Sequence, residues 1–201
     1  MIINDDLGAF LGLSADLGRA AARTIESAVY AKLIANPALS DSVALFHATH
    51  ANYQGTGAVI SVTSLDEARV AMASQLDVNG NDYLDIRPAI LLCPVSKGGL
   101  ARVTVNAVYD PDTANKLQKP NIVNGIVSTI IDTPRLTGNS WYLLADPSVA
   151  PTLEVVFLNG NSEPFLDMEN GFDVDGVRYK VRLDFGVGVV DYRGAFMNLG
   201  A

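Results

Sequence analysis

The N-terminal part of the chain carries hydrophobic residues at helical spacing. Over residues 16–36 one side of a 3.6-residue wheel is apolar, while Arg19, Arg23, Glu26 and Tyr30 fall opposite. The apolar stripe consists of Leu17, Ala21, Ile25, Ala28, Val29 and Ala35. The pattern predicts a helix of about 20 residues, or about 30 Å.

The expected limits of this helix follow from its end residues. Ser14 or Asp16 can cap its start, because a side-chain oxygen there accepts a hydrogen bond from a free backbone amide. Asn36 ends it, because the residue before Pro37 avoids the helical region. We therefore expect a long helix that acts as a structural strut.

A second helix is predicted after a polar segment. Residues 40–62 are rich in Thr, Asn, Gln and Gly, which favours loop and short strand. Residues 64–76 have helical character, and Ser64 and Glu67 have the spacing of a capping box. Residues 77–82 then predict a turn.

Strand patterns dominate the second half of the chain. Residues 90–95 form a continuous apolar run, typical of a central strand buried on both faces. Further strands are predicted at residues 141–145, 153–158 and 177–184, within and after a stretch that is rich in β-branched residues. Asn159-Gly160 and Asp175-Gly176 are dipeptides typical of hairpin turns. The elements together indicate an α+β fold.

Composition narrows the class of protein. The 201 residues suffice for one large domain or two small subdomains, and only 18% are charged, against 49% apolar. Apolar surface in such excess needs a cover, so we expect an oligomer. The net charge of −8 argues against a basic nucleic-acid-binding surface. No apolar run reaches membrane-span length, and Asp5 and Asp6 stand where a signal peptide carries positive charge.

Few residues of the sequence are candidates for catalysis or metal binding. His47 and His50 are the chain's two histidines, and their spacing can suit a metal ion on a helix, but the Glu of a metalloprotease motif is missing between them. We expect both to be structural, and a small metal-dependent hydrolase that uses them is the alternative. Cys93 lies in an apolar run without a basic neighbour, so an activated thiolate is not expected. We predict no catalytic, cofactor-binding or metal-binding residues, and no cofactor.

The predicted strand at residues 177–184 has two different faces. Val177, Tyr179, Val181 and Leu183 alternate with Arg178, Lys180, Arg182 and Asp184. Because successive side chains of a strand point to opposite faces, we expect the apolar set to pack inward. We expect the three cations to be exposed and to face acidic patches of a neighbouring subunit.

Several short segments occur in an informative order. They are VALFHATHAN (43–52), WYLLADP (141–147), GFDVDGV (171–177), VRLDFG (181–186) and DYRG (191–194). In this order they resemble the major capsid proteins of tailed phages and prophages, in particular the type encoded as a fusion behind a maturation protease, near the Mu-like major head subunits. The resemblance covers nearly the whole chain, including INDDLG at residues 3–8.

The resemblance implies a Hong Kong 97-type capsid fold, with a long spine helix, a peripheral β-hairpin arm and an axial-domain mixed sheet. Residues 1–60 and 150–184 would be peripheral-domain-like, with the spine helix at about residues 16–36 and the arm at residues 154–184. Residues 61–149 and 185–201 would be axial-domain-like. The family's N-terminal arm and protruding loop are expected to be absent from these residues.

The function that the resemblance implies is that of a structural, non-enzymatic subunit of a phage or prophage icosahedral capsid. Its copies would be made in the bacterial host cytoplasm and would form hexamers and pentamers that enclose the genome in the virion. Expected partners are other copies of the chain, a scaffold or protease segment and other head proteins, with only non-specific contact to packaged DNA and no membrane. A nanocompartment shell protein of the same fold is a further alternative.

Overall fold

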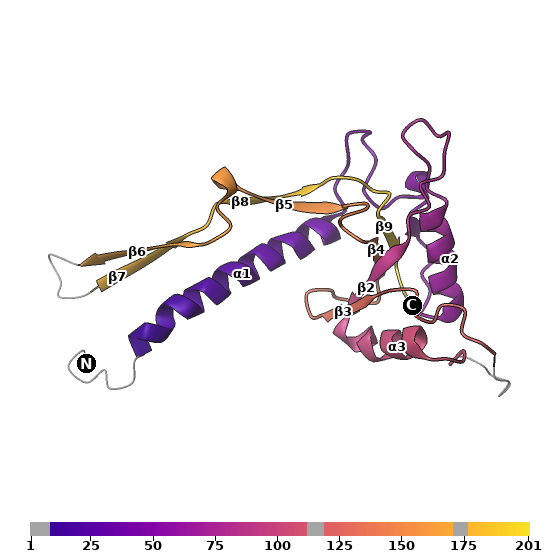
Figure 1. Cartoon of the computed structure of the whole chain (residues 1–201), viewed down its shortest axis with the longest axis horizontal. Coiled ribbons are helices and arrows are strands. Elements are labelled where there is room, and N and C mark those ends of the chain that lie inside the picture. The colour runs from indigo at the N-terminus through magenta and orange to yellow at the C-terminus, as the bar shows by residue number, and fades with distance from the viewer. Residues whose placement is uncertain (1–8, 112–118, 171–176) are drawn as a thin grey trace. The chain divides into compact units, whose positions relative to one another are not determined.

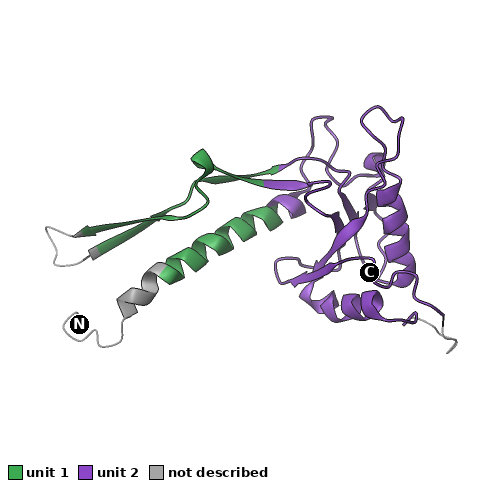
Figure 2. Ribbon diagram, viewed as in Figure 1, with its two compact units in different colours: residues 1–31, 155–188 green, residues 32–154, 189–201 purple. Residues whose placement is uncertain are grey.

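The computed structural model describes residues 9–111, 119–170 and 177–201, and the chain divides into two compact units (Figure 2). We call residues 1–31 with 155–188 the arm unit, and residues 32–154 with 189–201 the sheet unit. Each unit is therefore built from segments that are far apart in the sequence. The predicted turn at Asp175-Gly176 lies outside the described residues.

Helices and strands occur together, as Figure 1 shows. The helices are α1 (Ala9–Ala35), α2 (Val62–Ala73) and α3 (Val95–Asn106), with single 3-10 turns η2 (Ala48–His50) and η3 (Leu158–Gly160). The strands are β1 (Tyr53–Gln54), β2 (Pro88–Pro94), β3 (Thr129–Thr133), β4 (Trp141–Ala145), β5 (Leu153–Phe157), β6 (Phe165–Asn170), β7 (Val177–Arg182), β8 (Phe185–Val189) and β9 (Ala195–Asn198). This mixture confirms the predicted α+β class.

The helix α1 begins earlier than the sequence pattern predicts. Its first residue is Ala9, so Ser14 and Asp16 lie inside the helix, and the prediction that they cap it is wrong. Asp16 instead forms an ion pair with Arg19, one turn further along. Both side chains of this pair are exposed, and a polar residue on an exposed helix face costs little, so such a residue does not by itself mark a helix start.

The predicted end of α1 is confirmed. Asn36 follows the last helical residue with a φ of 44°, in the left-handed region that Asn tolerates. Its side-chain amide donates to Phe46 O at 3.1 Å, and its Oδ1 accepts from Phe46 N at 2.7 Å. These two bonds connect the end of the helix to the segment that follows it.

The N-cap of helix α2 lies three residues before the predicted one. Its N-cap is Ser61, whose hydroxyl accepts from Ser64 N at 3.2 Å. Ser64 Oγ accepts from Ser61 N at 3.0 Å in return. A capping box is therefore present, but Ser64 closes it from the position that we assigned to Glu67.

The helix α3 is missing from the sequence prediction. It contains Gly98 and Gly99, and each glycine disfavours a helix by about 1 kcal/mol relative to alanine. Packing explains Gly98, because a Cβ at this position would lie 2.6 Å from Asp132 Oδ2 and 2.7 Å from Asp132 Cβ on β3. Glycine therefore allows α3 to lie close to the sheet, and tertiary contact outweighs local propensity.

In the described residues of the sheet unit, five strands form one mixed sheet in the order β1-β9-β4-β2-β3. The pairs β1–β9 and β2–β3 are parallel, whereas β9–β4 and β4–β2 are antiparallel. The apolar strand β2 lies between β3 and β4, as expected for a strand with two covered faces. Leu91 of β2 is paired with Ile130 on one side and Leu143 on the other.

A single hydrophobic core fills the sheet unit. Its members come from α2, from α3, from the sheet and from connecting segments, and include Ile60, Leu65, Met72, Leu91, Val105, Val123, Trp141, Leu143 and Phe196. Trp141 is fully buried, and its indole Nε1 donates to Ala58 O at 2.9 Å. The one polar atom of this large side chain is thus satisfied within the core.

The strands β5–β8 and β6–β7 form two further sheets of two strands each. The pair β6–β7 is antiparallel, with a register from Phe165↔Arg182 to Asn170↔Val177, and we call it the arm ribbon. Asn159 and Gly160 have left-handed φ values of 54° and 73°, which fits the predicted turn. The strand before this turn, β5, pairs with β8, so the turn does not close a hairpin between consecutive strands.

Candidate functional site

The two histidines are each held by their own neighbours. His47 is exposed, and its Nδ1 accepts from Thr49 N at 3.1 Å at the start of η2. His50 is 4% exposed; its Nε2 lies 2.8 Å from Asp41 Oδ2 and its Nδ1 lies 3.2 Å from Leu45 O. These bonds hold the loop in shape and do not combine the two imidazoles in one site.

Asp41 is the charged neighbour of His50. The hydrogen bond from His50 and a second from Val43 N hold the pKa of the Asp41 carboxyl below its usual range. The carboxyl is therefore ionised at neutral pH and has no proton to give as a general acid. The His50 ring also stacks on Tyr192, with 3.9 Å between ring centroids and an angle of 5°.

A buried amide joins two of the segments that carry the family resemblance. Asn52 is 1% exposed, and its Nδ2 donates to Leu45 O at 2.8 Å and to Tyr192 O at 3.2 Å. Its Oδ1 accepts from His47 N at 3.1 Å. The Asn52 side chain thus satisfies backbone groups of residues 43–52 and 191–194, which gives these motifs a structural role.

Cys93 has the properties of a packing residue. It is fully buried on β2, directly opposite Asp132 of β3. Burial, and after it the charge of Asp132, raises the pKa of the Cys93 thiol, so the thiolate that a nucleophile needs is disfavoured. The Asp132 carboxylate is paired with Arg102 of α3, which lowers the pKa of Asp132.

Metal-binding arrangements were expected to be absent. Across residues 9–111, 119–170 and 177–201, no three His, Cys, Asp or Glu side chains are grouped so that they could hold a metal ion. The separate surroundings of His47 and His50 give the hydrolase alternative no support. That the chain holds no catalytic, cofactor-binding or metal-binding residue stays a prediction.

The membrane expectation concerns the helices alone. None of the helices in the described parts of the chain combines the length and the apolar character that a membrane span requires.

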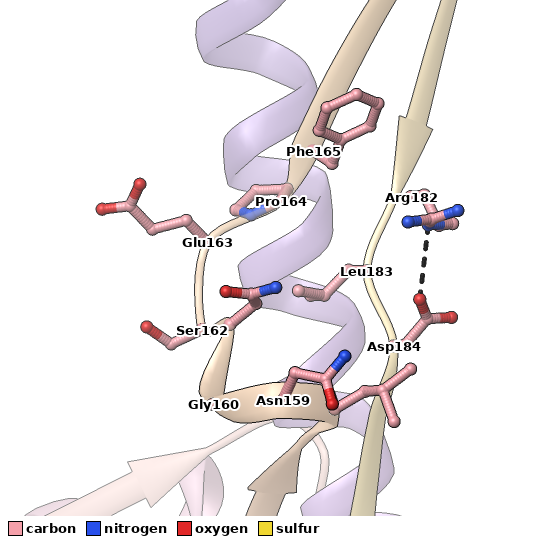
Figure 3. A pocket seen from close by; sticks show the side chains of 11 residues that line it. Asn159, Gly160, Ser162, Glu163, Pro164, Phe165, Arg182, Leu183 and Asp184 are labelled. Atoms are coloured by element: carbon pink, nitrogen blue, oxygen red, sulfur yellow. Dashed lines mark ion pairs between the residues drawn. The ribbon is translucent and has the colours of Figure 1, made fainter.

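A hollow of about 510 Å³ lies in the arm unit, between η3 and the base of the arm ribbon (Figure 3). It is lined by residues 158–165 and 182–184. Arg182 Nε lies 3.3 Å from Asp184 Oδ2, while Glu163 points away from this pair. A catalytic pair of carboxylates has to face a common substrate, and Glu163 and Asp184 do not.

The two faces of the arm ribbon differ in character. Residues directly opposite each other in an antiparallel pair share one face. One face therefore carries Phe165, Asp167 and Glu169 of β6 with Arg182, Lys180 and Arg178 of β7, and the other carries Leu166 and Met168 with Val181 and Tyr179. The ribbon thus has one charged face and one apolar face.

The prediction for the residues of β7 and the following loop is confirmed in part. Arg178, Lys180 and Arg182 are exposed, as expected. Tyr179, Val181 and Leu183 are only half-buried, so the expectation that they pack into an interior is wrong for the single chain. A ribbon of two strands has no second layer of its own, and its apolar face stays partly open.

The sequence prediction missed the acidic residues of the ribbon. Asp167 and Glu169 alternate with Leu166 and Met168, which is a period-two signal on its own. Their position opposite Lys180 and Arg178 depends on the strand register, which the sequence does not contain. Lys180 and Arg178 therefore each have an acidic residue directly opposite in the same chain.

A family model described as phage capsid protein matches residues 1–198 of the 201. Comparison with curated proteins finds none that matches.

Among solved structures, one from Mycobacterium phage Patience is similar at 12% sequence identity, with a TM-score of 0.42 over 81% of this chain. The match covers 48% of that structure's chain, so this chain spans about half the length of that relative.

The family match includes the buried hydrogen-bond network around Asn52, the sheet and the arm ribbon. A family of this kind is structural and not enzymatic, which fits residues whose contacts hold segments together. The chain belongs to the phage capsid protein family.

Proposed function

We propose that this chain is a major capsid subunit of the Hong Kong 97 type, close to the protease-fusion, Mu-like head subunits. In this proposal its copies form hexamers and pentamers, which close into an icosahedral shell around the phage genome. The family match over residues 1–198 supports a capsid role. The long helix, the arm ribbon and the mixed sheet support this particular type.

The proposed domains follow the sequence expectation. Residues 1–60 with 150–184 form the peripheral domain, with α1 as its spine, and residues 61–149 with 185–201 form the axial domain. The two compact units are divided at different residues, since residues 32–60 cluster with the sheet. Residues 9–31 of the spine and the arm ribbon lie both in the arm unit and in the proposed peripheral domain.

One observation carries the proposal of assembly. Among the side chains whose burial the structure describes (residues 15–111, 119–169 and 178–201), every buried one belongs to the sheet unit, and none belongs to the arm unit. Phe165, Leu166 and Met168 of the arm unit are 55%, 39% and 64% exposed. Apolar surface that one chain leaves open is covered when copies pack together in a shell.

The proposed partners follow from charge and location. Other copies of the chain cover the arm unit, and a scaffold or protease segment and other head proteins act during assembly. The net charge of −8 keeps contact with packaged DNA weak and non-specific.

Sedimentation and electron microscopy of the purified chain test the proposal. We expect ring-shaped capsomers or closed shells that appear as the protein concentration rises. A species of 21.3 kDa at every concentration, with a folded spectrum, would contradict it. Particles that enclose a protein cargo and exclude DNA when made in cells would favour the nanocompartment alternative.

A further inference from the structure

The two strands of the arm ribbon carry opposite charges. On the charged face, β6 contributes Asp167 and Glu169, whereas β7 contributes Arg178, Lys180 and Arg182. Arg182 is engaged locally, since its guanidinium carbon lies 5.8 Å from the Phe165 ring centroid and its Nε lies 3.3 Å from Asp184. Each long edge of the ribbon therefore has a single sign of charge.

Both edges of the ribbon are open. In the described part of the chain, β6 and β7 pair only with each other. The outward backbone N–H and C=O groups of each strand are thus available to a further strand, which is how extended segments add to a sheet. Since the proposed shell brings copies of this chain together, the further strand can come from the arm ribbon of a second copy.

Charge decides which edges can meet. A two-fold contact places a surface against itself, so it would bring β7 beside β7 or β6 beside β6. The first pairing sets three cations against three cations, and the second sets acidic residues against acidic residues. Like charges directly opposite each other destabilise a strand pair, whereas opposite charges stabilise it.

We propose that β6 of one copy lies antiparallel beside β7 of the next, so that arm ribbons of neighbouring copies join into a continuous sheet. This inference rests on the proposed shell assembly and adds the geometry of one contact. The contact is heterologous, which means that each copy uses one edge as donor and the other as acceptor. Heterologous contacts close into rings when the rotation permits, as hexamers and pentamers require.

The apolar face supports the same arrangement. Leu166 and Met168 lie on it beside Val181 and Tyr179 of the same ribbon. Side-by-side ribbons would place Leu166 and Met168 next to the corresponding Tyr179 and Val181 of the neighbour. The contact would therefore reduce the exposure of β6, where Leu166 is 39% and Met168 64% exposed.

An exchange of charges between the strands tests the proposal. The variant D167K/E169K/R178E/K180E keeps opposite charges within its own ribbon and between identical copies. Against the wild-type chain it sets basic β6 beside basic β7, and acidic beside acidic. We expect the variant to assemble alone like the wild type, and to separate from the wild type when the two chains are produced apart, mixed and assembled together.

Isotope labelling provides the readout. One chain is labelled with 15N, the particles are dissociated into capsomers, and native mass spectrometry counts mixed neighbours. We expect mixed contacts to fall about tenfold below random mixing, because like-charge contacts suppress wrong partners. The control D16R/R19D reverses the exposed ion pair on α1 and should mix at random with the wild type.

The other outcomes each contradict the proposal. Random mixing of the exchanged variant would mean that the ribbon charges act only within one chain. An excess of mixed contacts would indicate two-fold pairing of like strands. The proposal is also contradicted if the exchanged variant keeps the wild-type melting temperature but fails to assemble alone, because the exchange leaves opposite charges on the two paired edges.

Two further results keep the test decisive. If the four-residue variant melts at a lower temperature than the wild type, the smaller exchange D167K/K180E replaces it, because it alters only one facing pair. We expect this variant still to form fewer mixed contacts than random mixing would give. Random mixing would again contradict the proposal. A wild-type chain that stays monomeric would contradict the proposed shell function itself, and the ribbon contact with it.

Discussion

In the sheet unit, Leu91, Trp141 and Leu143 are fully buried by two helices and neighbouring strands. In the arm unit, Leu166 is 39% exposed and Met168 is 64% exposed, although they also lie on a strand with alternating side chains. The sheet unit covers its apolar side chains with helices and a five-stranded sheet, whereas the arm unit has α1 and two-stranded sheets and leaves these side chains partly open. The same local pattern therefore produces a core in one unit and an open surface in the other.

This difference assigns separate tasks to the two units. A sheet that is covered by helices is stabilised by the burial of its own side chains, which contributes about 25 cal/mol for each Å² of apolar surface removed from water. A ribbon of two strands is marginal in water by itself. We infer that the sheet unit stabilises the single chain, whereas the arm unit reaches its full stability in contact with other copies.

The largest expected effect is on the core of the sheet unit. Leu91→Ala removes a fully buried side chain between two strands and should lower the free energy of unfolding by about 2–5 kcal/mol. Trp141 is the only tryptophan and lies in this core, so its fluorescence in a urea titration reports the change. A loss below about 1 kcal/mol would show that the core is looser than the structure indicates.

A smaller effect is expected where α3 approaches the sheet. Gly98→Ala places a Cβ 2.6 Å from Asp132 Oδ2 and should cost about 1–3 kcal/mol, because helix and strand have to move apart. Gly99→Ala is the matched control, since nothing lies within 4 Å of a Cβ there, and should stabilise the helix by up to about 1 kcal/mol. Equal effects of the two substitutions would refute the close contact.

The arm ribbon should respond far less to a similar truncation. Leu166→Ala removes the same atoms as Leu91→Ala, but from a side chain that is 39% exposed. In the single chain, the free energy of unfolding, measured in urea by the fluorescence of Trp141, should fall by less than about 1 kcal/mol. The free energy of assembly into particles should fall by a larger amount. A loss of monomer stability as large as that of Leu91→Ala would contradict the contrast between the two units.

The smallest expected effect is on the stability of the chain at low pH. Arg102 holds the pKa of Asp132 below its usual value of 3.8, so this carboxylate contributes stability above that pH and loses it as the pH falls through the lowered pKa. The wild type should therefore lose more stability than Asp132→Asn between about pH 5 and pH 2. Urea midpoints at several pH values measure this, and parallel curves would mean that the ion pair contributes nothing.

Several elements were determined by the sequence itself. The strand β4 has the predicted limits, Trp141 to Ala145, because a short apolar run between turn residues has few alternatives. The end of α1 follows from Asn36-Pro37, since proline restricts the residue before it. The alternation in β7 is also local, because it needs only the period of an extended chain.

Other features were decided by the tertiary structure. The helix α3 exists against the local propensity of Gly98 and Gly99, since its packing on β3 requires a residue without a side chain. The charged face of the arm ribbon exists because the register places Asp167 opposite Lys180 and Glu169 opposite Arg178. A sequence pattern sets the period of each strand, but only pairing between distant segments decides which side chains share a face and which of them a second layer covers.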